Sequence, residues 1–243
     1  MAEGRWSRRA ERPGEYPAYL FEAYRSTSRR APTRPLLEAP LTLSELSGPG
    51  PAMAGMVEPD ADLTTNAGTG GEAIGERIIV TGRVLDADGR PQPGTLVEVW
   101  QANAAGRYHH ERDLHGAPLD PNFLGLGWCL TDDDGRYRFL TIKPGAYPWP
   151  NDPNSWRPAH IHFSLFGPSF VTRLITQMYF PGDPLLPLDP IFNSIPDEGA
   201  RARLVARYDH QVTQPMWALG FVWDIVLAGP RATPFEDAER RYA

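Results

Sequence analysis

The chain has 243 residues, 41% of them hydrophobic, and a formal net charge of −6, which allows one large β domain or two small ones. Its apolar runs are far shorter than the roughly 20 residues of a membrane-spanning helix, and no charged block is long enough to indicate binding to a membrane or to nucleic acid. The chain starts without a secretory signal pattern, and Cys129 has no second cysteine to pair with, so we expect a cytoplasmic protein.

Residues 1–75 show little hydrophobic periodicity, and we predict an N-terminal arm with loops. Arginines cluster near its start, with aromatic residues such as Tyr16 among them. This pattern suits an anion- or RNA-binding patch or, as we favour, an arm that packs on a partner subunit. The stretch NAGTGGEAIGE (66–76) has neither a preceding strand nor the G-K-[ST] of a phosphate-binding loop, so we interpret it as an ordinary loop.

Residues 76–243 are predicted to form a second unit that is dominated by strands. The runs RIIVTGRVLD (77–86) and TLVEVWQA (95–102) have strand composition and alternation, and FLGLGWCL with RYRFLTI repeats the scheme. Asp-Gly turns at 88–89 and 134–135 predict hairpins. The acidic runs at these turns lack the Glu that ends a calcium loop. Cys129 lies in an apolar run and is expected to be inert core rather than a nucleophile.

The segment KPGAYPWPNDPNSWRP (143–158) contains five prolines and no periodicity, and we predict a long functional loop. Three further apolar runs follow it, AHIHFSLFG, RLITQMYFPG and ALGFVWDIVLAG, and EGARARLVARYDH (198–210) is the only good helix candidate. Strands at short spacing with little helix predict an all-β fold. We expect a β-sandwich core with long proline-rich loops.

His160 and His162 lie one residue apart in a predicted strand, so their side chains project from the same face. Taken alone, the pair is as consistent with two polar residues as with two metal ligands. One cysteine excludes a thiolate zinc site. The run also lacks the nearby Glu that cupins place after their H-x-H. A ferrous site with two histidines and one carboxylate would need Asp152, which nothing else in the sequence supports.

Two tyrosines near the histidine pair indicate which metal would bind. Tyr147 lies in the proline-rich loop before the pair, and Tyr108 follows the TLVEVWQ strand. Phenolate is a hard anionic donor that suits ferric iron better than zinc or ferrous iron. Free tyrosine has a pKa near 10, so only a strongly Lewis-acidic ion would hold two phenolates near neutrality. Two histidines with two tyrosines therefore predict an Fe(III) site.

Three stretches resemble the intradiol ring-cleaving dioxygenases: TGRVLDADGRPQPGTLVEVWQANAAGRY, TDDDGRYRFLTIKPGAYPWPN and WRPAHIHFSLFG. The resemblance covers roughly residues 10–240. It implies one Fe(III) per chain, with Tyr108 and His160 as equatorial ligands and Tyr147 and His162 as axial ligands, all within residues 76–243. It also implies that an aromatic diol chelates the iron, displaces Tyr147 and then reacts with O2.

The resemblance also implies the substrate and its surroundings. Residues 1–75 lack the helical dimerisation pattern of the branches that act on catechol and hydroxyquinol, which favours the branch that acts on protocatechuate. Arg157 is expected to offset charge that develops on the ring, although a salt bridge that anchors the loop is the other interpretation. The remaining pocket residues, for which plain core is the alternative, are expected to be Tyr24, Trp149, Gln177 and Ile191.

In this branch, a homologous α subunit without the iron ligands provides much of the recognition of the substrate's carboxylate. A chain with all four ligands is then expected to be the catalytic partner in a large hetero-oligomer. The histidines beside Tyr108, which are His109, His110 and His115, are expected to lie at the surface. The alternatives are an intradiol enzyme for catechol, hydroxyquinol or another substituted diol, and a non-enzymatic β-sandwich binding module.

Overall fold

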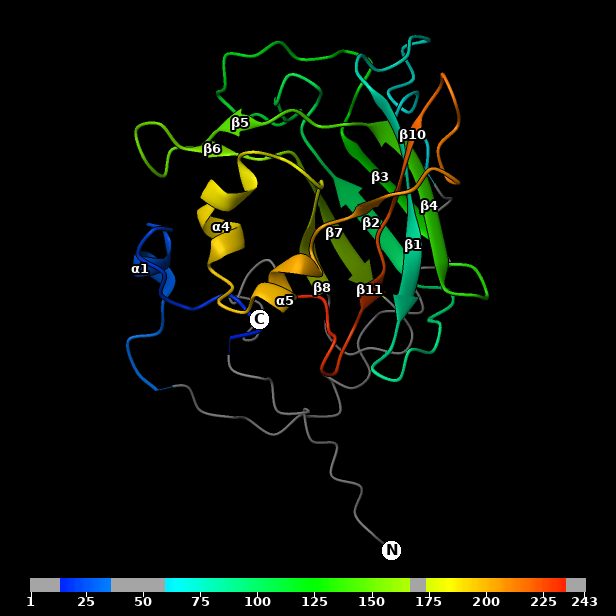
Figure 1. The fold of residues 1–243 in the computed structure, drawn as a ribbon. Coiled ribbons are helices and arrows are strands. Elements are labelled where there is room, and N and C mark those ends of the chain that lie inside the picture. The colour runs from blue at the N-terminus through cyan, green and yellow to red at the C-terminus, as the bar shows by residue number, and fades with distance from the viewer. Residues whose placement is uncertain (1–13, 36–59, 167–173, 235–243) are drawn as a thin grey trace, which may run out of the picture.

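A computed structural model of the protein describes residues 14–35, 60–166 and 174–234. Two β-sheets form its core, with short helices and long loops on one side (Figure 1). The predicted all-β fold with a sandwich core and little helix is confirmed. Within the described residues, no helix is long and apolar enough to cross a membrane.

The larger sheet is built around β1 (Arg77–Leu85), which forms ladders on both edges. On one edge it pairs antiparallel with β4 (Arg136–Ile142). On the other edge β10 (Leu219–Val222) and then β11 (Ile225–Val226) run parallel to it, and β9 (Arg207–Tyr208) completes the sheet beside β10. β1 therefore carries neighbours on both sides and lies inside the sheet.

The smaller sheet has four antiparallel strands in the order β3-β2-β7-β8. They are β2 (Leu96–Trp100), β3 (Leu126–Leu130), β7 (His160–Phe166) and β8 (Leu174–Tyr179). All residues of β7 but the last are buried, because one face packs on the larger sheet and loops cover the other. A polar residue on the covered face is therefore held in place rather than solvated.

Phe163 of β7 shows how the two sheets pack. Its ring centroid lies 4.8 Å from that of Trp223 and 5.8 Å from that of Phe139, both edge-on. Tyr137 is a third edge-on neighbour, and its buried hydroxyl donates to the carbonyl of Trp223 at 2.6 Å. Burial of such a side chain contributes about 1.5–3 kcal/mol, so the alternate residues of β7 that face this core fix the strand against the larger sheet.

Both Asp-Gly turns reverse the chain as predicted, and Leu85 pairs antiparallel with Pro91 across the first, but the longer strands that flank each turn do not pair with each other. β1 and β2 flank the first turn and lie in different sheets, as do β3 and β4 around the second. In each turn one aspartate, Asp86 or Asp132, accepts from the backbone two and four residues on, and a glycine with positive φ closes the reversal. These bonds reach only a few residues, so they fix the turn and not the pairing of the strands that follow.

The helix prediction for 198–210 is correct for one turn only. α5 (Glu198–Ala202) begins where Asp197 accepts from the backbone N–H of Ala200 at 2.6 Å, but residues 207–208 form β9. The indole of Trp223 donates to the carbonyl of Arg203 at 2.8 Å, which ties the chain to the larger sheet just beyond the helix. The other helical segments are α1 (Thr27–Arg30), η1 (Leu186–Leu188) and α4 (Pro190–Asn193).

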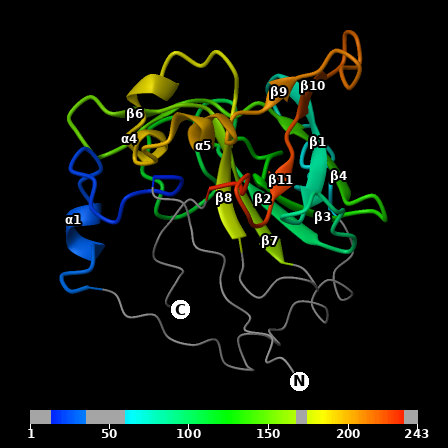
Figure 2. The same ribbon diagram turned by 60° about the horizontal axis from the view of Figure 1, so that its bottom comes forward.

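The predicted irregular loop 143–158 contains a short hairpin. β5 (Tyr147–Pro148) pairs antiparallel with β6 (Trp156–Arg157), so that Tyr147 lies opposite Arg157. Five prolines hid this pairing from the sequence analysis, because proline removes the N–H that a ladder normally uses. The hairpin, α4 and α1 lie on the same side of the molecule, away from β1 and β4 (Figure 2).

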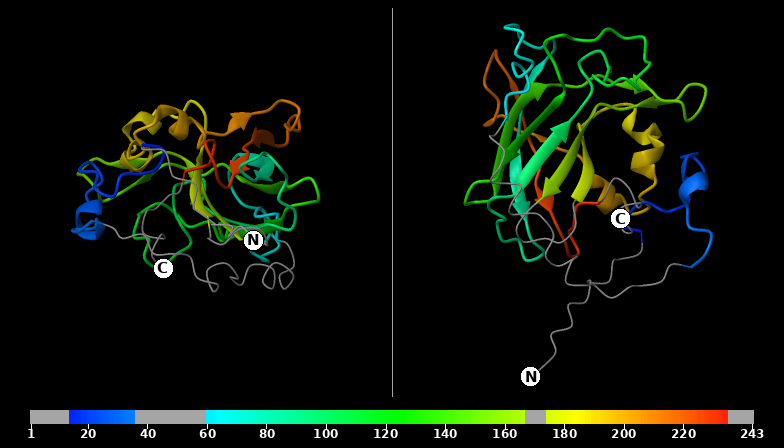
Figure 3. Two further views of the ribbon diagram at one scale, coloured as in Figure 1. Left: turned by 90° about the horizontal axis from the view of Figure 1, so that it is seen from below. Right: turned by 180° about the vertical axis from the view of Figure 1, so that it is seen from behind.

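The described part of residues 1–75 packs on its own chain. Leu63 is fully buried in the core. In the arm, Ala18 donates to the carbonyl of Ser194, and Gly14 accepts from Asp197. Figure 3 shows the arm running past α4. Residues 1–13 and 36–59 lie outside the described part, so packing of the arm on a partner subunit stays a prediction.

Cys129 is expected to be inert toward thiol reagents in the folded protein. It is 6% exposed, and burial raises the pKa of its thiol to about 11. Its thiolate fraction at pH 8 is therefore roughly a thousandth, and the thiolate is the reactive form. A chromogenic disulfide reagent should detect one thiol in denaturant and none in the native protein within minutes. Rapid native reaction at pH 8 would contradict the buried placement.

Candidate metal centre

His160 and His162 lie side by side on the loop-covered face of β7. His160 opposes Tyr179 across the ladder with β8, while His162 opposes Gln177 on β8 and Trp100 on β2. The two histidines are 2% and 8% exposed, and their ring centroids are 4.9 Å apart. A central strand with neighbours on both sides thus holds two adjacent imidazoles out of solvent.

Both imidazoles are fixed in orientation. The Nδ1 atom of His160 donates to the carbonyl of Pro158 at 2.7 Å, which leaves its Nε2 as the lone-pair nitrogen. Burial, followed by the charges of Arg157 and His162, holds the pKa of His160 well below its usual value. The ring of His162 stacks on Trp100 at 4.8 Å with an interplanar angle of 5°. Neutral imidazoles in fixed orientation are what a metal site requires.

Two tyrosine hydroxyls meet these imidazoles. The hydroxyl of Tyr108 lies 3.1 Å from Nε2 of His162, and that of Tyr147 lies 3.5 Å from Nε2 of His160. The two phenol rings meet edge-on at 5.4 Å. The structure therefore brings together all four residues that the sequence predicts as metal ligands, from one strand, one loop and one hairpin.

The loops that carry the two tyrosines contact each other through their backbones. Gly106 has φ of +77°, and a Cβ there would lie 2.1 Å from the carbonyl oxygen of Ala146. Asn103 accepts from the backbone N–H of Gly145 at 2.9 Å with its carbonyl, and from Arg107 at 3.0 Å with its side chain. A larger residue at 106 would push Tyr147 away from Tyr108, so this glycine sets the spacing of the two phenols.

The environment of Tyr147 combines burial with a nearby cation. Burial raises the pKa of this phenol, while the charge of Arg157 and a hydrogen bond with Tyr108 act in the opposite direction. The net direction is upward, so the phenol keeps its proton at neutral pH unless a stronger cation lies beside it. A phenolate at this position implies a bound metal ion.

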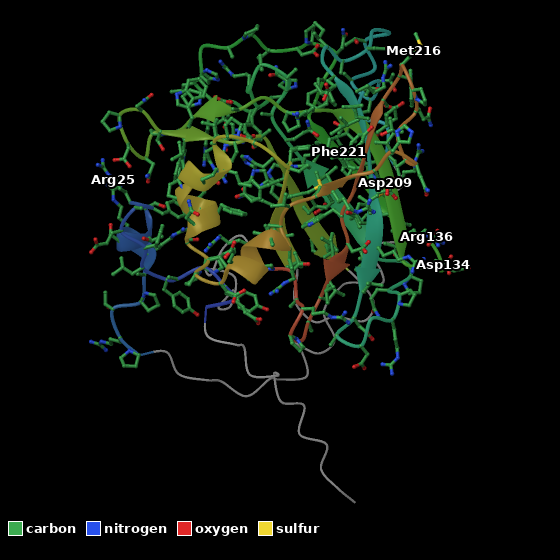
Figure 4. The ribbon with its side chains drawn as sticks, viewed as in Figure 1. Arg25, Asp134, Arg136, Asp209, Met216 and Phe221 are labelled. Carbon is green, nitrogen blue, oxygen red and sulfur yellow. The ribbon has the colours of Figure 1, made fainter. Side chains whose placement is uncertain are left out.

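In the described part of the chain, no group of three or more His, Cys, Asp and Glu side chains could hold a metal ion. Beside His160 and His162 the structure offers the phenol oxygens of Tyr108 and Tyr147 instead. Asp152, the carboxylate that a ferrous site would need, instead forms an ion pair of 2.7 Å with Arg25. Arg25 lies at the margin of the molecule (Figure 4).

Arg157 is buried beside the four residues and forms a salt bridge to Asp189 at 2.8 Å, as the alternative interpretation expected. Its Nη1 atom also lies 3.2 Å from Nε2 of His160, so the side chain reaches the candidate metal site as well. Sequence reasoning missed Asp189 and Tyr179. A signal existed for each, because Tyr179 shares a strand face with Gln177, and an aspartate before a proline often begins a helix.

The other predicted pocket residues fall into two groups. The ring of Trp149 lies 5.9 Å from the guanidinium carbon of Arg157, and Tyr24 meets that indole edge-on at 5.1 Å. Gln177 and Ile191 instead line a cavity of about 10 Å³, which has room for one water molecule at most. Trp149 and Tyr24 thus extend outward from Arg157, whereas this cavity is too small for an aromatic ring.

The three histidines beside Tyr108 take no part in the four-residue cluster. His109 and His110 are exposed, as expected. His115 is half-buried, and its ring meets Trp156 edge-on at 6.4 Å.

Asn151, which the sequence analysis did not single out, fastens the N-terminal arm to the pocket. Its side chain accepts from the backbone N–H of Arg25 at 2.9 Å and donates to the carbonyl of Ala23 at 2.7 Å. Asn151 is buried although it lies in a proline-rich loop. These two bonds hold Tyr24 against Trp149.

Asn151→Ala is expected to raise the KM for the substrate about threefold to tenfold and to leave kcat nearly unchanged, because each lost hydrogen bond is worth about 1 kcal/mol. Trypsin should also cut the variant faster after Arg25. Asn154→Ala, an exposed position in the same loop, serves as the control. Unchanged KM and unchanged proteolysis in Asn151→Ala would show that the arm is held by other contacts.

Two protein families match the sequence. The family described as "Dioxygenase" matches residues 49–229, and "Protocatechuate 3,4-dioxygenase beta subunit N terminal" matches residues 8–42. The second match covers the arm segment that contains Tyr24. The first contains Tyr108, Tyr147, His160 and His162.

Individual proteins match over most of the chain. The protocatechuate 3,4-dioxygenase beta chain of Burkholderia cepacia is 59% identical over 221 residues, which cover 91% of this chain and 94% of that protein. The alpha chain from the same organism is 30% identical and covers 68% of this chain and 79% of its own. The solved catechol 1,2-dioxygenase from Acinetobacter sp. ADP1 is 27% identical with a TM-score of 0.51, covering 68% of this chain and 55% of that one.

Proposed function

The chain belongs to the intradiol ring-cleaving dioxygenases, and on this basis we propose that it cleaves protocatechuate (3,4-dihydroxybenzoate) with O2 to 3-carboxy-cis,cis-muconate in aromatic-compound catabolism. The observation that carries the proposal is the 59% identity to a protocatechuate 3,4-dioxygenase beta chain along nearly its whole length. Two imidazoles and two phenols that converge on one point support it independently.

The family uses non-haem iron, and the residues present fit that metal. Two imidazole nitrogens and two phenol oxygens meet in a buried site, and the described residues offer no competing carboxylate or thiolate cluster. Hard phenolate donors favour the ferric state, so we propose one Fe(III) per chain, held by Tyr108, Tyr147, His160 and His162. The ion would supply Lewis-acid and redox chemistry toward the diol and O2.

The protein's own groups bind the diol and move its protons. We propose that the Tyr147 oxygen accepts a proton from one diol hydroxyl, because its distance to the neighbouring imidazole, 3.5 Å, is longer than the 3.1 Å of Tyr108. Arg157 would offset the negative charge that this leaves on the ring. Trp149 and Tyr24 would cover the ring on the outer side and exclude water. Gln177 and Ile191 are proposed to support the pocket.

We propose that the working enzyme is a hetero-oligomer with a homologous alpha chain. The similarity to both the beta and the alpha chain of one organism supports this. The beta-chain match at 59% identity far exceeds the alpha-chain match at 30%, so this chain would be the iron-bearing partner. Residues 1–75 would then provide the arm that borders the active site and packs on the partner.

Colour and substrate choice test the proposal together. Purified protein loaded with iron should be red-brown, because tyrosinate donates charge to ferric iron. The assembled enzyme should consume O2 with protocatechuate faster than with catechol or hydroxyquinol. A colourless protein that still holds its metal would refute the ferric tyrosinate site. A coloured protein that prefers catechol or hydroxyquinol would leave the ferric site standing and refute only protocatechuate as the substrate.

A further inference from the structure

We infer that Asp189 is a positioning residue that acts through Arg157. Its carboxylate holds the guanidinium so that one nitrogen, Nη1, faces the metal and the substrate. The inference rests on the proposed function, since it takes Arg157 as the group that meets the diol.

The contact between Asp189 and Arg157 is a side-on pair with two hydrogen bonds. The Nε atom of Arg157 donates to Oδ1 of Asp189 at 3.3 Å, and Nη2 donates to Oδ2 at 2.8 Å. The side chains are 3% and 0% exposed. A bidentate pair fixes the plane of the guanidinium as well as its distance, and a buried arginine requires such a counterion.

The Nη1 and Nη2 atoms of Arg157 have different surroundings. Nη2 also reaches Oε1 of Gln177 at 2.7 Å and the hydroxyl of Tyr179 at 3.0 Å. Nη1 lies 3.2 Å from Nε2 of His160, and the guanidinium also forms a hydrogen bond with Tyr147. Once Nε2 of His160 binds a metal it can no longer accept a hydrogen bond, so Nη1 becomes available to a substrate oxygen.

The same carboxylate also starts the helix that carries a second pocket residue. Oδ1 of Asp189 accepts from the backbone N–H of Ile191 at 3.3 Å, with Pro190 as the first helical residue of α4. One buried group therefore fixes both Arg157 and Ile191 relative to the site. No other buried acid in the described residues contacts Arg157.

Asp189→Asn is the variant that tests this role, because asparagine keeps the shape and the helix cap while it removes the charge. In the assembled, iron-loaded enzyme we expect kcat/KM for protocatechuate to fall about 10- to 100-fold. Iron content and visible colour should be unchanged. Anaerobic titration with protocatechuate, followed by the colour change, should show weaker binding. Asp197→Asn, the matched cap of α5, should behave as wild type.

The same substitution made in the Arg157→Met variant distinguishes a positioning role of Asp189 from general support of the fold. If Asp189 acts through Arg157, adding Asp189→Asn to Arg157→Met should change neither kcat/KM nor the anaerobic affinity further. An equal loss in both backgrounds would overturn the inference, as would wild-type binding by Asp189→Asn. If Asp189→Asn does not fold, Arg157→Met/Asp189→Leu removes both charges and should match Arg157→Met alone. A wild-type enzyme that fails to bind protocatechuate would refute the proposed function instead.

Discussion

Tyr147→Phe is expected to keep its iron but to bind the diol about 100-fold more slowly. Tyr108, His160 and His162 remain to hold the metal, so the loss falls on proton uptake. The hydroxyl that lies 3.5 Å from His160 is the proposed acceptor of the substrate proton, and a phenyl ring cannot replace it. Metal analysis and stopped-flow mixing with protocatechuate in the absence of O2 measure the two effects separately.

Tyr208→Phe is the matched control for this experiment. It makes the same chemical change at an exposed tyrosine of β9, in the other sheet, and should leave iron content and binding rate unchanged. Wild-type binding kinetics in Tyr147→Phe would show that this phenol is not the proton acceptor. Complete loss of iron would show that it is an indispensable ligand.

Arg157→Lys is expected to lower kcat/KM by about 100-fold or more. Lysine keeps a positive charge beside Asp189, so the fold should persist. Its single ammonium cannot contact Asp189 and Gln177 together as the guanidinium does and still reach the proposed substrate. Steady-state O2 consumption with protocatechuate measures the loss, and thermal unfolding checks that the protein remains folded.

Arg136→Lys provides the comparison for Arg157→Lys. Arg136 is exposed and pairs with Asp134 at the edge of the larger sheet, on the opposite margin of the molecule from Arg25 (Figure 4). An exposed pair of this kind contributes little, so its activity should equal that of wild type. Equal activity in both lysine variants would mean that Arg157 serves only as an anchor for the loop.

The sequence was sufficient for features that depend on local spacing. Alternation along 159–167 predicted that His160 and His162 share a face, and the structure confirms that they project together from β7. Strand patterns at short spacing with little helix predicted an all-β sandwich, which the two sheets confirm. Burial of β7 on both faces could not be predicted, because it depends on loops far away in the chain.

Contacts between distant segments were missed. In the sequence, Asn151 is one polar residue among others in a proline-rich loop. Its hydrogen bonds to the backbone of residues 23 and 25 could not be predicted, because these partners lie more than a hundred residues away. Asp189 likewise gives a local signal for a helix start but none for Arg157. The pairing of β1 with β4 rather than β2 is also non-local, since turn chemistry sets a reversal and the cores of both sheets decide the partner.

The parallel ladder of β1 has a consequence for the order of folding. Ile78 pairs with Leu219 and Val84 with Ile225, so more than half of the chain separates strands that lie side by side. During synthesis β1 and β4 can pair early, but the other edge of β1 stays open until β10 emerges from the ribosome. Such late pairing slows folding and leaves the nascent chain with an unpaired strand edge that can bind other chains. Truncation before residue 219 should therefore produce aggregates, although every candidate iron ligand would still be present.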